Sequence, residues 1–140
     1  ALENASTYLR FAGSSIPEWE FLGEVAQRAD FGILLDVNNV YVSAVNHGFD
    51  PESYLAAVPA ERVWEIHLAG HTDRGSHLLD THSTHVCEEV WELYHFASRR
   101  IGAVASLVEW DEDIPDWDTL EAESGRARDV QHRALFAGAA

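Results

Sequence analysis

Acidic and imidazole side chains recur near the ends of the short apolar segments of this chain. Asp36 closes one apolar run, His67 lies near the end of the next, and Glu109 lies near the end of the last. Carboxylate and imidazole groups together suit iron, manganese or zinc, and harder cations are preferred as carboxylates accumulate. Several carboxylates that converge in a cleft repel one another strongly unless a cation offsets their charge. These residue types therefore predict a metal site.

The candidate ligands share a position at or just beyond an expected strand end. They are Glu3, Asp36, Asn39, His67, Asp80, His82 and Glu109. Each has a plain structural alternative, because a strand histidine is commonly a hydrogen-bonded structural residue and a strand-end aspartate commonly caps a helix. The same bias at four strand ends argues against coincidence, and both interpretations stay open at this point.

Four further polar residues near these segments are ambiguous. His47 lies in Asn46-His47-Gly48, which either reaches the site as a loop or forms a turn, as Asn and Gly favour. His71 follows the His67 segment and is a ligand, a substrate contact or a loop residue. Asn38, like its neighbour Asn39, either hydrogen-bonds a ligand or stabilises a bend. Asp111 belongs to an acidic turn that we expect to be solvated.

Helical and strand patterns alternate along the chain. Short apolar runs predict strands over residues 31–37, 63–68 and 104–110. Helices are predicted over residues 15–28, 50–57, 86–100 and 116–136. Ser15 is the expected N-cap of the first and Asp50 of the second, and Gly102 is expected to end the third. Strands that alternate with helices imply βαβ units and a parallel sheet. The fold class is therefore α/β, with helices either on both faces of the sheet or around the outside of a barrel.

Side-chain alternation explains how such strands would present a site. One face of each strand is apolar and suits packing against helices. Asp36, His67 and Glu109 lie on the other face, and Asp80 and His82 point the same way in a further extended segment. In a parallel barrel, active sites are built at the C-terminal ends of the strands. These five residues are thus expected at one end of the sheet.

The composition of the chain indicates which kinds of binding partner to expect. The chain has 140 residues, which fits one domain, and 46% of them are hydrophobic, which is enough for a core. Acidic residues outnumber basic ones 24 to 9, so we expect neither nucleic-acid nor membrane binding. No apolar run approaches the ~20 residues of a membrane span. The single cysteine, Cys87, forms no internal disulfide, which favours a reducing, cytoplasmic compartment.

Short motifs occur in a characteristic order along nearly the whole chain. They cover residues 2–6, 16–22, 34–42 (LLDVNNVYV), 46–48, 65–71 (EIHLAGH), 80–82, 90–94 and 109–111. Together they closely resemble the family of the methanobactin-biosynthesis oxidase, a multinuclear non-haem iron family that is also grouped as an uncharacterised protein family. The combination is far more specific than any one motif.

The resemblance implies a fold and an activity. The fold would be a TIM-type barrel akin to sugar-isomerase barrels, holding two or three iron ions. The activity would be an oxygen-dependent oxidase that modifies cysteine residues of a ribosomally made peptide. A partner protein that presents the peptide is also implied.

The resemblance also implies roles for individual residues. The bridging ligand would be Glu3. A central iron would be completed by Asp36, His67 and Glu109. Another iron would be held with help from Asn39, Asp80 and His82. The pocket would be lined by His47 and His71, which are also potential additional ligands.

The length departs from the family pattern. Family members are about twice as long, and a closed eight-stranded barrel needs ~250 residues. We therefore expect residues 1–140 to be the C-terminal half of one barrel domain, without the histidines that earlier strands supply. Such a half-barrel would expose sheet edges and apolar surface, through which a homodimer could form.

Two other functions stay open from the sequence. One is a metal-dependent sugar isomerase or hydrolase barrel that uses manganese or zinc. The other is a non-enzymatic metal- or peptide-binding module. Oxygen consumption with a cysteine-containing peptide would separate the oxidase from both.

Overall fold

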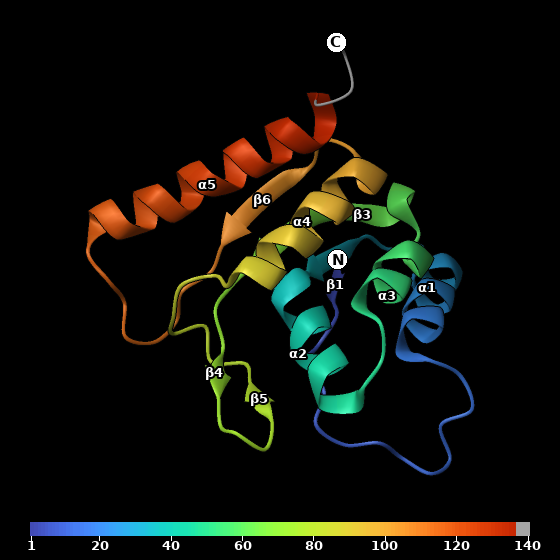
Figure 1. The fold of residues 1–140 in the computed structure, drawn as a ribbon. Coiled ribbons are helices and arrows are strands. Elements are labelled where there is room, and N and C mark those ends of the chain that lie inside the picture. The colour runs from blue at the N-terminus through green and yellow to red at the C-terminus, as the bar shows by residue number, and fades with distance from the viewer. Residues whose placement is uncertain (137–140) are drawn as a thin grey trace.

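Four short parallel strands form the centre of the fold, and a computed structural model describes residues 1–136. The strands lie in the order β1 (Leu2–Glu3), β2 (Ile33–Asp36), β3 (Val63–Leu68) and β6 (Ala105–Val108) (Figure 1). Each neighbouring pair is parallel. The α/β class and the parallel sheet are therefore confirmed.

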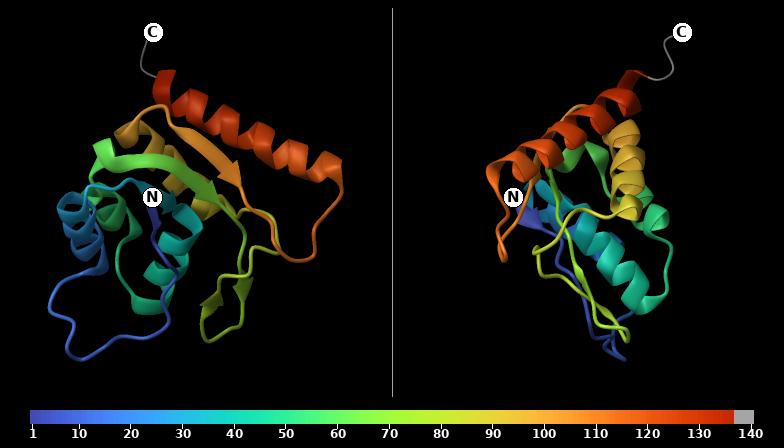
Figure 2. Two further views of the ribbon diagram at one scale, coloured as in Figure 1. Left: turned by 180° about the vertical axis from the view of Figure 1, so that it is seen from behind. Right: turned by 60° about the vertical axis from the view of Figure 1, so that its left-hand side comes forward.

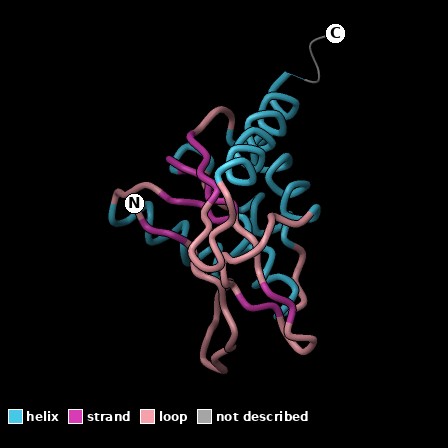
Figure 3. The backbone as a smooth tube through the Cα atoms, turned by 90° about the vertical axis from the view of Figure 1, so that its left-hand side faces the viewer, coloured by secondary structure: helices cyan, strands magenta, loops and turns pink. Residues whose placement is uncertain are grey.

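Helices connect these strands and lie mainly on one face of the sheet (Figures 2 and 3). They are α1 (Glu18–Ala29), α2 (Val37–His47), α3 (Pro51–Ala57), α4 (Glu88–Ile101) and α5 (Trp117–Phe136), with a 3-10 turn at Ala60–Arg62. The view from behind in Figure 2 shows β3 and β6 without a helix in front of them. This is the arrangement of a barrel wall with helices outside. Within residues 1–136, no helix combines the length and apolarity needed to cross a membrane.

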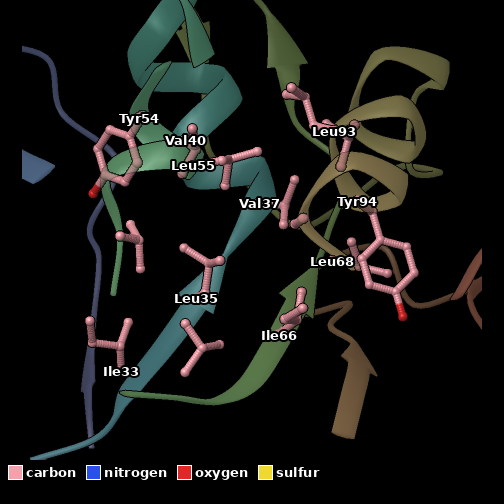
Figure 4. Packing of buried hydrophobic residues seen from close by; sticks show 14 of the residues in the cluster. Ile33, Leu35, Val37, Val40, Tyr54, Leu55, Ile66, Leu68, Leu93 and Tyr94 are labelled. Atoms are coloured by element: carbon pink, nitrogen blue, oxygen red, sulfur yellow. The ribbon is translucent and has the colours of Figure 1, made fainter. Parts of the chain in front are cut away.

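The core lies between the sheet and these helices. Ile33 and Leu35 of β2 and Ile66 and Leu68 of β3 are all fully buried on the helix-facing side (Figure 4). Alternate residues therefore point to the opposite, barrel-interior side, as the alternation predicted. Full burial of each such aliphatic side chain stabilises the fold by about 1.5–3 kcal/mol. By alternation, Trp64 lies on the same apolar face of β3 as Ile66 and Leu68 and was expected to pack against helices. Its side chain is instead largely exposed.

Most predicted boundaries differ from the structure by a few residues. Asp50 caps α3 as expected, accepting hydrogen bonds from two backbone N–H groups, and Gly102 ends α4 with a positive φ of 93°. Ser15, however, is not the cap of α1. Pro17 occupies that position with extended backbone, and the helix begins at Glu18. Proline has no N–H to leave unpaired, so it fits a helix start.

The helix α2 was missed by the sequence analysis. The strand was expected to reach Val37, and Asn38 and Asn39 either to bond a ligand or to stabilise a bend. Instead, β2 ends at Asp36 and a helix begins at once. Valine and asparagine have low helix propensity, so the sequence of this segment did not predict a helix. Two caps define it, because the Asp36 side chain accepts a hydrogen bond from Asn39 N and Gly48 adopts a left-handed conformation. His47 is therefore the last residue of a helix and not part of a loop.

The extended segment that precedes Asp80 also lies elsewhere than expected. Leu78–Leu79 is β5, which pairs with β4 (Thr72–Asp73) in an antiparallel hairpin outside the main sheet. The arrowheads of β3 and β6 point toward the side where this hairpin lies (Figure 2). Asp80 and His82 therefore reach the end of the sheet from a connecting loop.

Candidate metal centre

Donor groups from four strand ends meet at the C-terminal end of the sheet. Glu3 ends β1, Asp36 ends β2, His67 lies near the end of β3, and Glu109 directly follows β6. Each offers one ligand atom, and these four atoms all lie within 4.8 Å of one another. His67 Nδ1 is 3.1 Å from Glu109 Oε2 and 3.7 Å from Glu3 Oε1. The structure thus brings four predicted residues together, and their role as ligands stays a prediction.

The parallel register explains this convergence. Asp36 pairs directly with His67 across β2 and β3. The backbone N–H of Glu109 donates to the Leu68 carbonyl at 2.8 Å, which continues the pairing of β3 with β6 by one step. Parallel strands in register present their last residues at a common edge, and the pleat turns these side chains to one face.

Asn4 links β1 to β2 and was missed by the sequence analysis. Its side chain is 3% exposed and bonds both backbone groups of Asp36: it donates to the carbonyl and accepts from the N–H, each at 2.9 Å. Its own carbonyl accepts from Asn39 Nδ2 at 3.0 Å. Because β1 has only two residues, this contact fixes the spacing of Glu3 and Asp36. An Asn directly after a strand-end Glu was the available signal.

Asp36 is the most deeply buried member of the group. One oxygen, Oδ1, accepts the helix-capping bond from Asn39 N at 2.6 Å, while Oδ2 is buried and makes no hydrogen bond. Burial raises the pKa of Asp36 to about 7, against the lowering effect of the Asn39 bond. Burial also raises the pKa of Glu3, and Glu109 adds to that effect. An orphaned buried carboxylate oxygen among other carboxylates fits a cation-binding position.

A second group lies beside the first and shares Glu109 with it. His82, Glu109 and Asp111 also place ligand atoms within 4.8 Å of one another. His82 Nδ1 is 3.5 Å from Glu109 and 3.3 Å from Asp111, and His82 Nε2 is 2.7 Å from Asp80 Oδ1. Neither ring nitrogen has hydrogen-bonding geometry although both are buried. The Asp80 carboxylate is the main reason that the pKa of His82 is raised to about 9.

The other predicted residues take different positions. Asp80 joins neither group of converging atoms but touches His82. Asn39 turns its amide N–H toward Asn4, and its Oδ1 is buried without a hydrogen bond. His47, at the end of α2, has a buried Nε2 without a partner, and His71 bonds Asn38 through Nδ1 at 2.8 Å. Neither histidine belongs to the converging groups.

Asp111 was expected in a solvated turn, but it contributes to the second group. Its side chain is indeed mostly exposed, yet Oδ2 lies against His82. Its backbone N–H donates to the His82 carbonyl at 2.8 Å, which holds the two segments together. The available signal was the spacing of two from Glu109, which places both side chains on the same side of extended backbone.

The raised pKa of Asp36 predicts a pH dependence of stability for metal-free protein. The folded-state pKa is about 7 against an ordinary value of 3.8, so the stability linked to the protonated form is complete below about pH 4 and lost as the pH rises through 7. Urea unfolding of chelator-treated wild type and Asp36→Asn at pH 4.5, 6 and 7.5 measures this. We expect the stability advantage of the variant to grow with pH. A constant difference would contradict the assignment.

Comparison with known proteins places the chain in a family. The family profile described as "RiPP precursor modification enzyme MbnB/TglH/ChrH" matches residues 1–132, where RiPP denotes a ribosomally made, modified peptide. A UPF0276 protein of Anaeromyxobacter sp. (strain Fw109-5) is 60% identical over 136 residues, covering 97% of this chain and 48% of that protein. A UPF0276 protein of Acaryochloris marina is 50% identical over 134 residues, covering 94% and 49%.

A third relative matches this chain with similar identity and coverage. A UPF0276 protein of Caulobacter vibrioides is 52% identical over 127 residues, covering 91% of this chain and 45% of that protein. The chain thus spans about half the length of the curated relatives it matches. The match over nearly the whole chain identifies it as a member of the MbnB/TglH/ChrH family of RiPP precursor modification enzymes.

Proposed function

We propose that this chain belongs to a multinuclear non-haem iron oxidase that uses oxygen to modify cysteine residues of a ribosomally made peptide. The observation that carries the proposal is the convergence of Glu3, Asp36, His67 and Glu109 at the sheet end. Membership of a family of peptide-modifying enzymes supplies the substrate class.

The donor set fits a divalent iron ion. Three carboxylates and one imidazole form the first group, and such mixed oxygen and nitrogen ligands suit iron, manganese or zinc. Bound iron would supply redox chemistry with oxygen and an open coordination position. The buried, unbonded Oδ2 of Asp36 supports this fit, since a buried carboxylate without a partner is unfavourable unless a cation is present.

Each residue has a separate task in this proposal. Asp36, Glu3 and His67 would hold the first ion, and the chain anchors them through β1, β2 and β3. Glu109 belongs to both groups, so Glu109, rather than the Glu3 that the resemblance implies, would be the ligand shared by two ions. His82 and Asp111 would contribute to the second ion. Asp80, which lies 2.7 Å from His82, would orient that ring.

The peptide and its presentation remain proposals. Active sites of parallel barrels lie at the C-terminal ends of the strands, where these groups lie, so the peptide would enter there. A separate protein that presents the peptide would bind beside this opening. Pairing of two copies through the edge strands β1 and β6 is a further proposal, because each has a strand neighbour on one side only within residues 1–136. Sedimentation of the purified chain tests it.

A second candidate is supported by the same donor set. Carboxylate and imidazole ligands hold manganese or zinc as readily as iron, so a metal-dependent isomerase or hydrolase would use the same residues. Such an enzyme would consume no oxygen. Activity with manganese or zinc in place of iron would favour this candidate.

The test uses the complete polypeptide reconstituted anaerobically with Fe(II). We expect two or three bound irons, and oxygen consumption with a mass change at cysteine when a cysteine-containing peptide is added. Glu109→Gln should lower bound iron by at least one ion and reduce oxygen consumption by more than about 100-fold, because it removes a shared ligand.

Glu65→Gln is the matched control. Glu65 is another acid of the sheet, and its Oε1 lies 3.9 Å from His67 Nε2, but it belongs to neither converging group. Iron content and oxygen consumption should stay near wild type in this variant. Absence of bound iron in the wild type, or equal losses in both variants, would refute the iron site.

A further inference from the structure

Asn38 lies between Asp80 and His71, two predicted site residues that belong to neither converging group. It is the second residue of α2, and its side chain is fully buried. Its Nδ2 donates to Asp80 Oδ1 at 2.7 Å. Its Oδ1 lies 2.8 Å from Nδ1 of His71. The amide thus joins the loop that carries Asp80 to the end of the segment that carries His71.

The orientation of this amide follows from the chemistry of Asp80. A carboxylate offers only acceptor oxygens, so the N–H₂ side of Asn38 must face Asp80. The Asn38 carbonyl oxygen then faces His71. Because a carbonyl oxygen only accepts hydrogen bonds, Nδ1 of His71 must carry the proton. The neutral ring then has an unprotonated Nε2.

The ring of His71 is also held in place. Tyr41 is three residues after Asn38, on the same side of α2, and its ring packs against His71 with a centroid separation of 5.3 Å and an interplanar angle of 41°. The carbonyl of His71 accepts a hydrogen bond from Thr84 Oγ1 at 3.1 Å. Ring and backbone are therefore both fixed, which limits the directions that Nε2 can take.

The unprotonated Nε2 of His71 has no partner within the described part of the chain. No hydrogen bond joins Nε2 of His71 to residues 1–136, and this atom is outside both groups of converging ligand atoms. His71 reaches the converging groups only through Asn38, which bonds Asp80, the neighbour of His82. An oriented acceptor at this place, without a partner in residues 1–136, is suited to a donor group on a substrate.

We propose that Asn38 holds His71 in the Nδ1–H tautomer, so that Nε2 accepts a hydrogen bond from a donor group of the bound peptide. The part that concerns the peptide rests on the proposed function, whereas the tautomer does not. Asn38 is a positioning residue in this scheme, and His71 contacts the substrate.

The tautomer is measured without any activity. Long-range ¹H–¹⁵N correlation spectra of the complete, metal-free polypeptide with ¹⁵N-labelled histidine show which ring nitrogen of His71 carries the proton, and His71→Asn identifies its signals. We expect protonated Nδ1 and unprotonated Nε2 at pH 7.5. Asn38→Ala should shift the ring toward the Nε2–H form that free histidine prefers. A wild-type His71 in the Nε2–H or doubly protonated form, or an unchanged tautomer in Asn38→Ala, would overturn the proposal.

The peptide contact is tested with two substitutions of His71. His71→Asn keeps an amide donor in place of Nδ1 but has no group at Nε2, while His71→Gln places an amide near the Nε2 position. We expect the KM for the peptide to rise about tenfold in His71→Asn and to recover in part in His71→Gln, with bound metal unchanged in both.

The outcomes separate this inference from the proposed function. Loss of metal from His71→Asn would assign His71 to the ligands and contradict a substrate contact. An unchanged KM would remove the peptide contact and leave the tautomer intact. A wild type without oxidase activity would contradict the proposed function, while the NMR result would still decide the role of Asn38.

Discussion

Replacing Asp36 with Asn will abolish metal binding at the first group and will stabilise the metal-free fold. The variant removes a charged ligand, so affinity should fall by more than about 100-fold, beyond the 10–100-fold effect typical of residues that only support a ligand. The Asn side chain can still accept the helix-capping bond from Asn39 N. The fold therefore keeps the cap and loses a buried charge.

The gain in stability follows from the raised pKa of Asp36, which is about 7. One pKa unit corresponds to about 1.4 kcal/mol, so the free energy of unfolding should increase on the order of 2–4 kcal/mol at pH 8. Urea unfolding with a chelator measures this change, and metal analysis measures the loss. A variant that is more stable but binds less metal is typical of a site whose functional residues lower the stability of the fold.

Asp50→Asn is the matched control for Asp36→Asn. Asp50 also caps a helix, but it is exposed and its pKa is lowered, chiefly by the hydrogen bond from Ser53. This variant should retain its metal and become slightly less stable. The assignment of Asp36 would be wrong if Asp36→Asn retained metal or if both variants changed stability in the same direction.

Replacing Gly70 with Ala will displace the loop that carries His82. A Cβ on Gly70 would lie 2.0 Å from the carbonyl oxygen of Thr84 and 2.5 Å from its carbonyl carbon. These are backbone atoms and cannot rotate away, so the loop must move. The backbone bond from His82 N to Gly70 O, now 3.1 Å, would be lost with it. We expect a destabilisation of about 3 kcal/mol.

Gly125→Ala provides the contrast for Gly70→Ala. Gly125 is in the middle of α5, and apart from its chain neighbours and the backbone of its own helix no atom lies within 4 Å of a Cβ there. Alanine there should stabilise the protein by about 0.5–1 kcal/mol, because glycine is unfavourable in a helix. Urea unfolding compares the two variants, and metal analysis should show reduced binding only in Gly70→Ala. Wild-type stability and metal content in Gly70→Ala would mean that the close approach does not hold the loop.

The parts of the fold that the sequence predicted are those with a strong local pattern. The strand 63–68 has the expected bounds, and the helix that follows Asp50 begins at its predicted cap. The helix α2 was missed because its residues favour strands and bends, while its stability comes from burial against the rest of the core. Local propensity could not reveal that packing.

The candidate site was predictable in part for a related reason. Glu3, Asp36, His67 and Glu109 meet because parallel strands end at one edge, which alternation along each strand already indicates. The position of Asn4 directly after a strand-end Glu was its only signal, because its bonds to Asp36 depend on the register of β1 against β2.

The loop contributions were harder to foresee. His82 approaches Asp111 only after the segment beyond the hairpin folds back over the sheet end. The contact between Asn38 and His71 joins residues that are 33 positions apart, on elements whose relative placement is set by the tertiary fold. The spacing of two between Glu109 and Asp111 indicates only a shared side of the backbone, and no spacing pattern indicates the contact of Asn38 with His71.

Anomalous diffraction at the iron edge tests the metal centre most directly. Crystals of the complete polypeptide, reconstituted anaerobically with Fe(II), should show an anomalous peak among Glu3, Asp36, His67 and Glu109. A second peak should lie among His82, Glu109 and Asp111. Protein that binds iron but shows no anomalous density at either position would contradict the metal centre proposed for this sheet end.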